Sequence, residues 1–184
     1  SGTVMDSAIS QTVQACCDMS ASKTGALIIF ERGVALNSII STGTVINADT
    51  TAELLKNMFF NKAPLHDGAV IIRDGRIAAA GCVLPLTQRT NLSKDLGMRH
   101  RAGIGLSEES DAVIIVVSEE TGAISAAMDG MLKRHLSGEA LDKLLRSELI
   151  REEDSTEKHG LIDNIRNFFK VNANVDEKQD EENL

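Results

Sequence analysis

The sequence predicts an α/β fold of the α+β kind, with a central mixed, largely antiparallel, twisted β-sheet flanked by helices. Residues 25–30 form a continuous apolar run, which is typical of a central strand covered on both faces. Two further strands, 70–73 and 76–84, are joined by Asp74-Gly75, a strong two-residue hairpin signal. Segments with helical periodicity precede and follow these strands, so the sheet is expected to carry helices.

The elements before the hairpin follow from periodicity and capping. Residues 4–17 have apolar side chains at helical spacing, so they predict an amphipathic helix. This helix either packs on the sheet or leads in from a membrane anchor, and we favour packing. After the strand at 25–30, a second strand is expected at 34–40. The segment Asp49-Thr50-Thr51 offers an N-cap for a helix at 52–60 that ends before Pro64.

The elements after the hairpin alternate again between helix and strand. We expect a polar loop at 87–94, a helix at 98–106, strands at 112–117, 123–127 and 132–136, and a helix at 139–150. Ser137 is expected to cap the last helix, whose leucines fall on one face.

The chain divides into three parts by composition. Residues 1–20 are expected to form a helix leading into the domain, and 21–150 form the folded domain. Residues 151–184 form an acidic C-terminal extension with one short amphipathic helix and partial disorder. Ser1-Gly2 without an initiator Met is typical of a cloning scar. With 184 residues and 42% hydrophobic content, we expect one core.

Charge and cysteine content exclude several classes of protein. The net charge of −8 and the pI near 5.0 argue against a nucleic-acid partner, so any anionic ligand needs a local basic pocket. Cys16 and Cys17 are adjacent and Cys82 lies in a predicted strand, so neither a disulfide framework nor a CxxC metal site is indicated. No run of eighteen apolar residues occurs, which predicts a soluble chain without a signal peptide.

Two motifs could carry chemistry. Asp67 lies just before the apolar run 69–72, and Gly68 beside it would let a ligand approach the backbone closely. Taken alone, the Asp-Gly pair is an ordinary turn former. Residues 99–101 read Arg-His-Arg, whose donors suit phosphate oxygens, and a helix starting there would add its free N–H groups. The alternative for this cluster is a basic surface turn.

Read with Ser-Glu-Glu-Thr-Gly at 118–122, these motifs resemble the diadenylate cyclase family, and its membrane-type members in particular. The resemblance covers residues 25–150 and rests on three motifs in the same order. It implies the DAC-domain fold and the condensation of two ATP molecules into cyclic di-AMP, with two diphosphates released. Residues 21–150 would then be the catalytic domain.

The resemblance also implies roles for individual residues. The implied catalytic residues are Asp67, Gly68, Arg99, His100 and Arg101. The implied ATP-binding residues are Leu27, Gly68, Ala69, Leu84, Arg99, His100, Arg101, Ser118 and Glu119. The implied ligands of a divalent metal, Mn²⁺ or Mg²⁺ with Co²⁺ as a further option, are His66, Asp67 and Glu120.

Each of these roles has a plainer alternative. A lone loop histidine such as His66 more often makes a hydrogen bond, Glu119 and Glu120 could be a solvated pair, and Leu27 could pack in the core. The loop Thr42-Gly43-Thr44 could complete the adenine pocket or merely turn the chain.

Two positions depart from the family pattern. Met98 stands where many relatives have Thr, so a hydroxyl contact to phosphate is lost. Val83 stands where some relatives have an aromatic residue, which predicts a looser grip on adenine, with Leu84 as the apolar wall.

The reaction constrains the assembly. The chain has one copy of each motif but the reaction needs two facing ATP molecules, so we expect a homodimer. By resemblance, a membrane regulator and a phosphoglucosamine mutase are further partners. The full-length parent would be attached, by a segment absent from this chain, at the cytoplasmic face of the bacterial membrane. The alternative function is a catalytically silent module that senses ATP or cyclic di-AMP, whereas the absence of a GxxxxGK[ST] loop argues against other ATP-dependent transferases.

Overall fold

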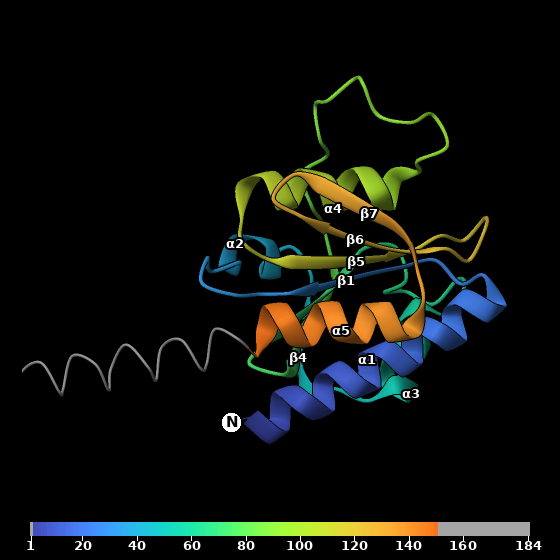
Figure 1. Cartoon of the computed structure of the whole chain (residues 1–184). Coiled ribbons are helices and arrows are strands. Elements are labelled where there is room, and N and C mark those ends of the chain that lie inside the picture. The colour runs from blue at the N-terminus through green and yellow to red at the C-terminus, as the bar shows by residue number, and fades with distance from the viewer. Residues whose placement is uncertain (1, 151–184) are drawn as a thin grey trace, which may run out of the picture.

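The computed structural model of the chain describes residues 2–150, in which a seven-stranded sheet carries helices on both faces (Figure 1). The strands are β1 (Ala26–Phe30), β2 (Thr44–Asp49), β3 (Ala69–Arg73), β4 (Arg76–Cys82), β5 (Val113–Val117), β6 (Ile124–Met128) and β7 (Met131–Leu136). The helices are α1 (Gly2–Ser22), α2 (Asn37–Ile40), α3 (Ala52–Phe59), α4 (Met98–Glu109) and α5 (Gly138–Leu149).

The sheet is mixed and largely antiparallel, as the sequence predicts. Its strand order is β2-β4-β3-β1-β5-β6-β7. Only the pairing of β1 with β3 is parallel among the described strands, and it is reached by the connection that contains α3. The central strand β1 therefore lies between a parallel and an antiparallel neighbour.

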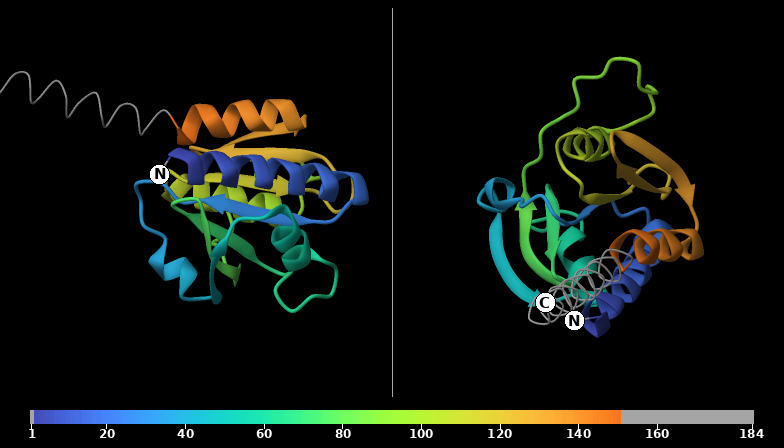
Figure 2. Two further views of the ribbon diagram at one scale, coloured as in Figure 1. Left: turned by 90° about the horizontal axis from the view of Figure 1, so that it is seen from below. Right: turned by 60° about the vertical axis from the view of Figure 1, so that its left-hand side comes forward.

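Alternating residues of the central strands divide the core into two layers. Ile28 and Phe30 belong to a cluster with buried residues of α1, α3 and α5. Leu27 and Ile29 belong to a second cluster on the opposite face, with residues of α4. Figures 1 and 2 show the same layers, with α1 and α5 side by side on one face and α4 on the other. Because both faces of β1 are covered, the run at 25–30 is apolar throughout.

The N-terminal helix packs on the domain. The helix predicted at 4–17 is confirmed and is longer, and it contacts α3 and α5 with Ile9 and Cys16 fully buried. Between residues 2 and 150, no helix combines the length and the apolar character needed to cross a bilayer.

The strand predicted at 34–40 is wrong, because residues 37–40 form the short helix α2. In a strand, the backbone N–H groups of this segment would donate hydrogen bonds to a neighbouring strand, but here they donate to side-chain carboxylates. The carboxylate of Asp111 accepts from the N–H groups of Gly33 and Val34, each at 2.9 Å, and Glu31 accepts from that of Leu36 at 2.8 Å. The apolar residues of this segment fold as a loop and one helical turn.

The edge strand β2 is the strand that periodicity missed. Among the described strands it pairs with β4 only, its side chains are exposed or half-buried, and the register shifts between Val45 and Ala48. Asn47 lies in the shifted stretch with φ +52°. An exposed strand with an irregularity has no clear alternation of apolar and polar residues, so its signal is weak.

The remaining elements are confirmed with small changes at their ends. The β3–β4 hairpin turns at Asp74 and Gly75, whose φ angles of +51° and +75° are those of a type I′ turn. Thr51 caps α3 by accepting from the N–H of Leu54, and Ser137 caps α5. The strand predicted at 132–136 is β7. The amphipathic helix and the disorder predicted beyond residue 150 lie outside the described residues.

Candidate active site

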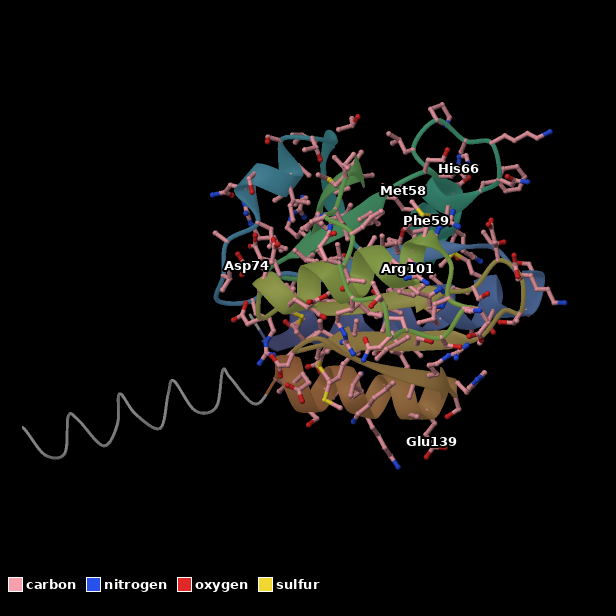
Figure 3. The ribbon with its side chains drawn as sticks, turned by 90° about the horizontal axis from the view of Figure 1, so that it is seen from above. Met58, Phe59, His66, Asp74, Arg101 and Glu139 are labelled. Atoms are coloured by element: carbon pink, nitrogen blue, oxygen red, sulfur yellow. The ribbon has the colours of Figure 1, made fainter. Side chains whose placement is uncertain are left out.

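The strand directions bring the predicted motifs to one edge of the sheet. Because β3 is parallel and β5 antiparallel to β1, the start of β3 and the end of β5 flank the start of β1. Ala26 is paired with Val117, so Ser118 follows next to Gly25, and Gly68 precedes β3 at the same edge. Figure 3 shows His66 and Asp74 at opposite ends of the molecule, one before and one after β3.

The helix α4 places its N-terminus at this edge. Its N-cap is Gly97, which supplies no side-chain acceptor, so the first N–H groups of the helix have no partner within it. The partial positive charge at this end therefore adds to the charge of Arg99. Gly103 lets α4 approach the sheet closely, because a Cβ there would lie 3.1 Å from Ile114 and 3.3 Å from Val116.

A cavity of about 330 Å³ lies in front of this helix end. It is lined by residues 94–100, 117–121, Ala123, Ser125 and Arg134. The structure thus brings together Arg99 and His100 from one predicted motif with Ser118, Glu119 and Glu120 from another. Its volume is at the lower end of small-molecule sites, about 300–1,000 Å³.

Arg99 is positioned by a glycine and a carboxylate. Its Nη1 lies 3.4 Å from Glu119 Oε2, and its guanidinium covers Gly25, where a Cβ would lie only 2.5 Å from Nη1. The Arg99 side chain is 21% exposed and that of Glu119 is 66% exposed. The guanidinium is therefore held at the cavity, while its partner remains largely in water.

His100 is buried and lines the cavity. Burial lowers the pKa of His100 below its usual value, and the positive charges of Arg134 and Arg99 lower it further against the opposing effect of Asp95. A neutral imidazole has one N–H to donate to an anionic ligand.

Ser118 shapes the turn between β5 and β6. Its hydroxyl oxygen accepts from the N–H groups of Glu120 and Thr121, both at 3.2 Å. The hydroxyl proton remains able to donate into the cavity. Ser20, at the end of α1, donates to the carbonyl of Gly122 at 2.5 Å, which ties the turn to the N-terminal helix.

His66 and Asp67 form a pair that suits a cation. His66 Nδ1 lies 2.7 Å from the carbonyl oxygen of Ala63, which can only accept, so Nδ1 carries a proton. The other ring nitrogen, Nε2, lies 3.2 Å from Asp67 Oδ1. The lone pair of Nε2 and the carboxylate oxygen therefore point towards the same space, where both could be ligands of one cation. The pair therefore fits a divalent metal as two of its ligands.

Glu120 is not gathered with this pair. Within residues 2–150, no three His, Cys, Asp or Glu side chains lie close enough together to hold a metal. Glu120 lines the cavity, whereas His66 and Asp67 lie on the loop before β3 at the same edge. The three-residue ligand set stays a prediction.

The backbone geometry at position 68 requires glycine, in addition to the predicted close approach of a ligand. Its φ is +150°, and a Cβ there would lie 2.7 and 2.8 Å from backbone atoms of Gly81 and 2.9 Å from the carbonyl oxygen of Cys82. The glycine therefore allows β3 and β4 to meet closely just behind Asp67.

Several implied ATP-binding residues do not line this cavity. Leu27, Ala69 and Leu84 belong to the buried cluster under α4. Arg101 is half-buried one turn into α4, and its carbonyl accepts from the N–H of Thr87 at 3.1 Å. The three apolar residues thus pack in the core, and their contact with ATP stays a prediction.

The two departures from the family pattern and the loop at 42–44 lie on the surface around the site. Met98 and Val83 are exposed to 66% and 65%. Thr42 Oγ1 accepts from the N–H of Val83 at 2.9 Å, and Gly43 packs against Cys82. The loop therefore supports the end of β4, and Thr44 already belongs to β2.

Sequence reasoning missed Lys94, Asp95, Ser125 and Arg134. Arg134 and Ser125 lie in strands, where alternation identifies a face but no chemical role. Lys94 and Asp95 lie in a loop that composition marks only as polar. The sequence carries a basic residue at 134 but no signal that relates it to residue 95.

Comparison with known proteins agrees with this geometry. The model of the DAC family, described as DisA bacterial checkpoint controller nucleotide-binding, matches residues 13–132. Cyclic di-AMP synthase CdaA of Bacillus subtilis is 45% identical over 152 residues, which is 80% of this chain and 56% of that protein. Diadenylate cyclase CdaS of Bacillus thuringiensis is 54% identical over 114 residues, 62% of this chain and 57% of that protein. The chain spans about half the length of these curated relatives.

Solved structures share the fold. The crystal structure of DacA from Staphylococcus aureus has a TM-score of 0.75 at 44% identity, covering 77% of this chain and 94% of that one. A hypothetical membrane spanning protein from Bacillus cereus has a TM-score of 0.67 at 49% identity, covering 70% and 63%. The predicted DAC-domain fold is confirmed. With its family match over residues 13–132 and this shared fold, the chain belongs to the DAC family of nucleotide-binding domains.

Proposed function

We propose that this domain is a diadenylate cyclase, which condenses two ATP molecules into cyclic di-AMP and two diphosphates. The observation that carries the proposal is the cavity at the N-terminus of α4, lined by Arg99, His100 and Ser118, at the same sheet edge as Asp67. The names of the relatives, cyclic di-AMP synthase and diadenylate cyclase, support the same reaction.

The cavity residues suit the phosphate chain of ATP. Arg99 has a forked guanidinium, His100 has one ring N–H and the first turn of α4 has free backbone N–H groups. Positioning and charge neutralisation dominate phosphoryl and nucleotidyl transfer, so donors with fixed positions are what the reaction needs. Holding the α-phosphate still is the role that we assign to this group.

We assign to Asp67 the activation of the attacking 3′-hydroxyl of ATP. Its side chain is 84% exposed, so a hydroxyl can reach it, and its Oδ1 lies 3.2 Å from Nε2 of His66. A divalent ion, Mn²⁺ or Mg²⁺, bound by these two residues would lower the pKa of the hydroxyl and stabilise negative charge at the α-phosphate. Glu120 could contribute a further oxygen only if it approached them.

The active site is proposed to form between two chains. Each chain offers one phosphate cavity and one Asp67, and two ATP molecules must face each other for both bonds to form. The exposure of Asp67 supports this arrangement, because an outward carboxylate can serve a nucleotide that is bound by a second chain.

The alternative is a module that binds ATP or cyclic di-AMP without catalysis. Met98, at the rim of the cavity, favours it, since a thioether cannot donate to phosphate. The paired His66 and Asp67 favour the enzyme, because binding an anion alone gives no use for an exposed carboxylate beside it. For the full-length parent we propose the cytoplasmic face of the membrane, supported by similarity to a membrane spanning protein.

The test is incubation of the chain with ATP and Mn²⁺ or Mg²⁺ at several protein concentrations, followed by chromatography and mass analysis. Cyclic di-AMP that rises more than proportionally with protein supports a cyclase that works as a dimer. ATP binding without product from either metal would favour the sensing module.

The substitution Asp67→Asn should lower product formation by about 10²-fold or more, because it removes a base while keeping the shape. The measurement is the rate of cyclic di-AMP formation at saturating ATP. Asp74→Asn is the matched control, since Asp74 lies in the hairpin at the other end of β3, where Asn tolerates the positive φ. Equal rates for Asp67→Asn and the control would remove Asp67 from the reaction.

A further inference from the structure

Arg134 reaches the cavity from β7, on a different element from the predicted phosphate ligands. Its guanidinium binds Asp95 through both nitrogens, with Nη2–Oδ2 at 2.6 Å and Nη1–Oδ1 at 3.5 Å. The hydrogen bond from Arg134, helped by one from Ser93, lowers the pKa of Asp95 to about 2. Asp95 is therefore a carboxylate at neutral pH, and it holds Arg134 at the cavity.

The loop that carries Asp95 has other attachments. Arg89 donates to the carbonyl of Gly130 at 2.6 Å, and the N–H of Thr87 donates to the carbonyl of Arg101 at 3.1 Å. Leu96 is also buried, with 7% of its surface exposed. Two hydrogen bonds that do not involve Asp95 or Arg134 thus tie the loop to α4 and to the β6–β7 turn, so the ion pair is not its sole attachment.

The carboxylates at this cavity can leave their arginines at low cost. Asp95 and Glu119 are 58% and 66% exposed, whereas Arg134 and Arg99 are 34% and 21% exposed. Exposed ion pairs contribute little net free energy, and a released carboxylate regains its water. Phosphate oxygens accept the same forked pair of hydrogen bonds from a guanidinium and carry more charge. Both arginines are therefore already oriented towards an anion, and a phosphate chain can replace the carboxylate as that anion.

Ser125 supplies an independent sign of a ligand. It lines the cavity from β6, only 1% of its surface is exposed, and its hydroxyl has no hydrogen-bond partner among residues 2–150. A buried hydroxyl without a partner costs free energy, which a bound acceptor would recover.

We infer that Arg134 is a phosphate-binding residue of the nucleotide site and that Asp95 occupies its guanidinium until the phosphate chain of the nucleotide replaces the carboxylate. The inference rests on the proposed function for the identity of the ligand, a nucleoside triphosphate. Arg99 on α4 and Arg134 on β7 then bind the phosphate chain from two elements of the cavity wall.

The test is calorimetric titration of the whole chain with ATP and with AMP, each in the presence of Mg²⁺. Arg134→Gln should weaken ATP binding by about tenfold or more, as expected for lost hydrogen bonds to a charged group, and should weaken AMP binding much less. Arg134→Lys, which keeps the charge but loses the fork, should fall between. Arg76→Gln is the matched control, because Arg76 forms its ion pair with Asp49 at the far end of β4.

The substitution Asp95→Asn separates ligand binding from loop support. If Asp95 competes with phosphate for Arg134, removing its charge should leave ATP affinity unchanged or raise it. If the pair only holds the loop, Asp95→Asn should weaken ATP binding as much as Arg134→Gln does, and the inference is wrong. ATP affinity of Arg134→Gln equal to that of the Arg76→Gln control would also overturn it.

These titrations do not require turnover. A chain that binds ATP through Arg134 but makes no cyclic di-AMP would refute the proposed function and leave the inference standing. If the chain makes cyclic di-AMP while Arg134→Gln binds ATP normally, the proposed function stands and the inference about Arg134 is refuted. A chain that binds neither ATP nor inorganic triphosphate would refute the phosphate-binding role.

Discussion

At the scale of single residues, two glycines at neighbouring strand starts have different tasks. Gly68 meets backbone atoms of Gly81 and Cys82, which cannot move without disturbing β4. Gly25 meets the end of the Arg99 side chain, which can rotate away. Replacement by alanine should therefore lower stability at Gly68 and weaken ligand binding at Gly25.

Gly68→Ala should lower the free energy of unfolding by about 1–3 kcal/mol, because the residue would combine positive φ with a backbone clash. Chemical denaturation is the measurement. Unfolding at the denaturant concentration of the unsubstituted chain would mean that the β3–β4 contact can relax.

Gly25→Ala serves as its counterpart. It should unfold close to the unsubstituted chain and bind ATP more weakly, because its Cβ displaces the Arg99 guanidinium from the cavity. Unchanged ATP affinity in a folded Gly25→Ala chain would show that Arg99 does not need this position.

At the scale of elements, helix termini decide what each helix contributes. The N-cap of α4 is Gly97, which supplies no side-chain acceptor, so this terminus is available to an anion. By contrast, α5 begins at Ser137, whose hydroxyl accepts from the N–H of Ala140 at 3.1 Å. The uncapped helix faces the cavity, and the capped one packs on the opposite face of the sheet.

Ser137→Ala should destabilise the domain by about 1 kcal/mol, since it removes the cap of α5. Thermal unfolding should show a midpoint lower by about 2–4 °C. Ser137→Gly is the control, because glycine at an N-cap costs only a few tenths of a kcal/mol, about a quarter of the alanine effect. Equal loss in both variants would point to a role of Ser137 other than capping.

At the scale of the whole molecule, the buried His100 links folding to pH. The unfolded chain has a histidine pKa of about 6.5, and burial with Arg134 and Arg99 nearby lowers it in the folded chain, while Asp95 opposes the shift. Between the two pKa values the unfolded chain binds more protons. The contribution of His100 to stability is therefore complete above pH 6.5 and is lost as pH drops towards the folded pKa.

Thermal unfolding between pH 7.5 and 5.5 tests this linkage. The unsubstituted chain should lose more stability on acidification than His100→Gln, which cannot bind the proton. The chain has 4 histidines, and the others are present in both variants, so their effects cancel in the comparison. An equal loss of stability on acidification in both variants would mean that His100 is not the group that links stability to pH.

The sequence alone determined the class of fold, because buried strands are apolar on both faces and the Asp74-Gly75 turn fixes the hairpin. It also determined the family, because the motifs at 65–69, 99–101 and 118–122 are local in the chain. The metal ligand set, the homodimer, the membrane regulator and the mutase stay predictions. Only the tertiary structure decided that Arg134 and Asp95 meet at the cavity and that Leu27 packs in the core. Contacts between residues far apart in the chain depend on strand order and register, which periodicity does not encode.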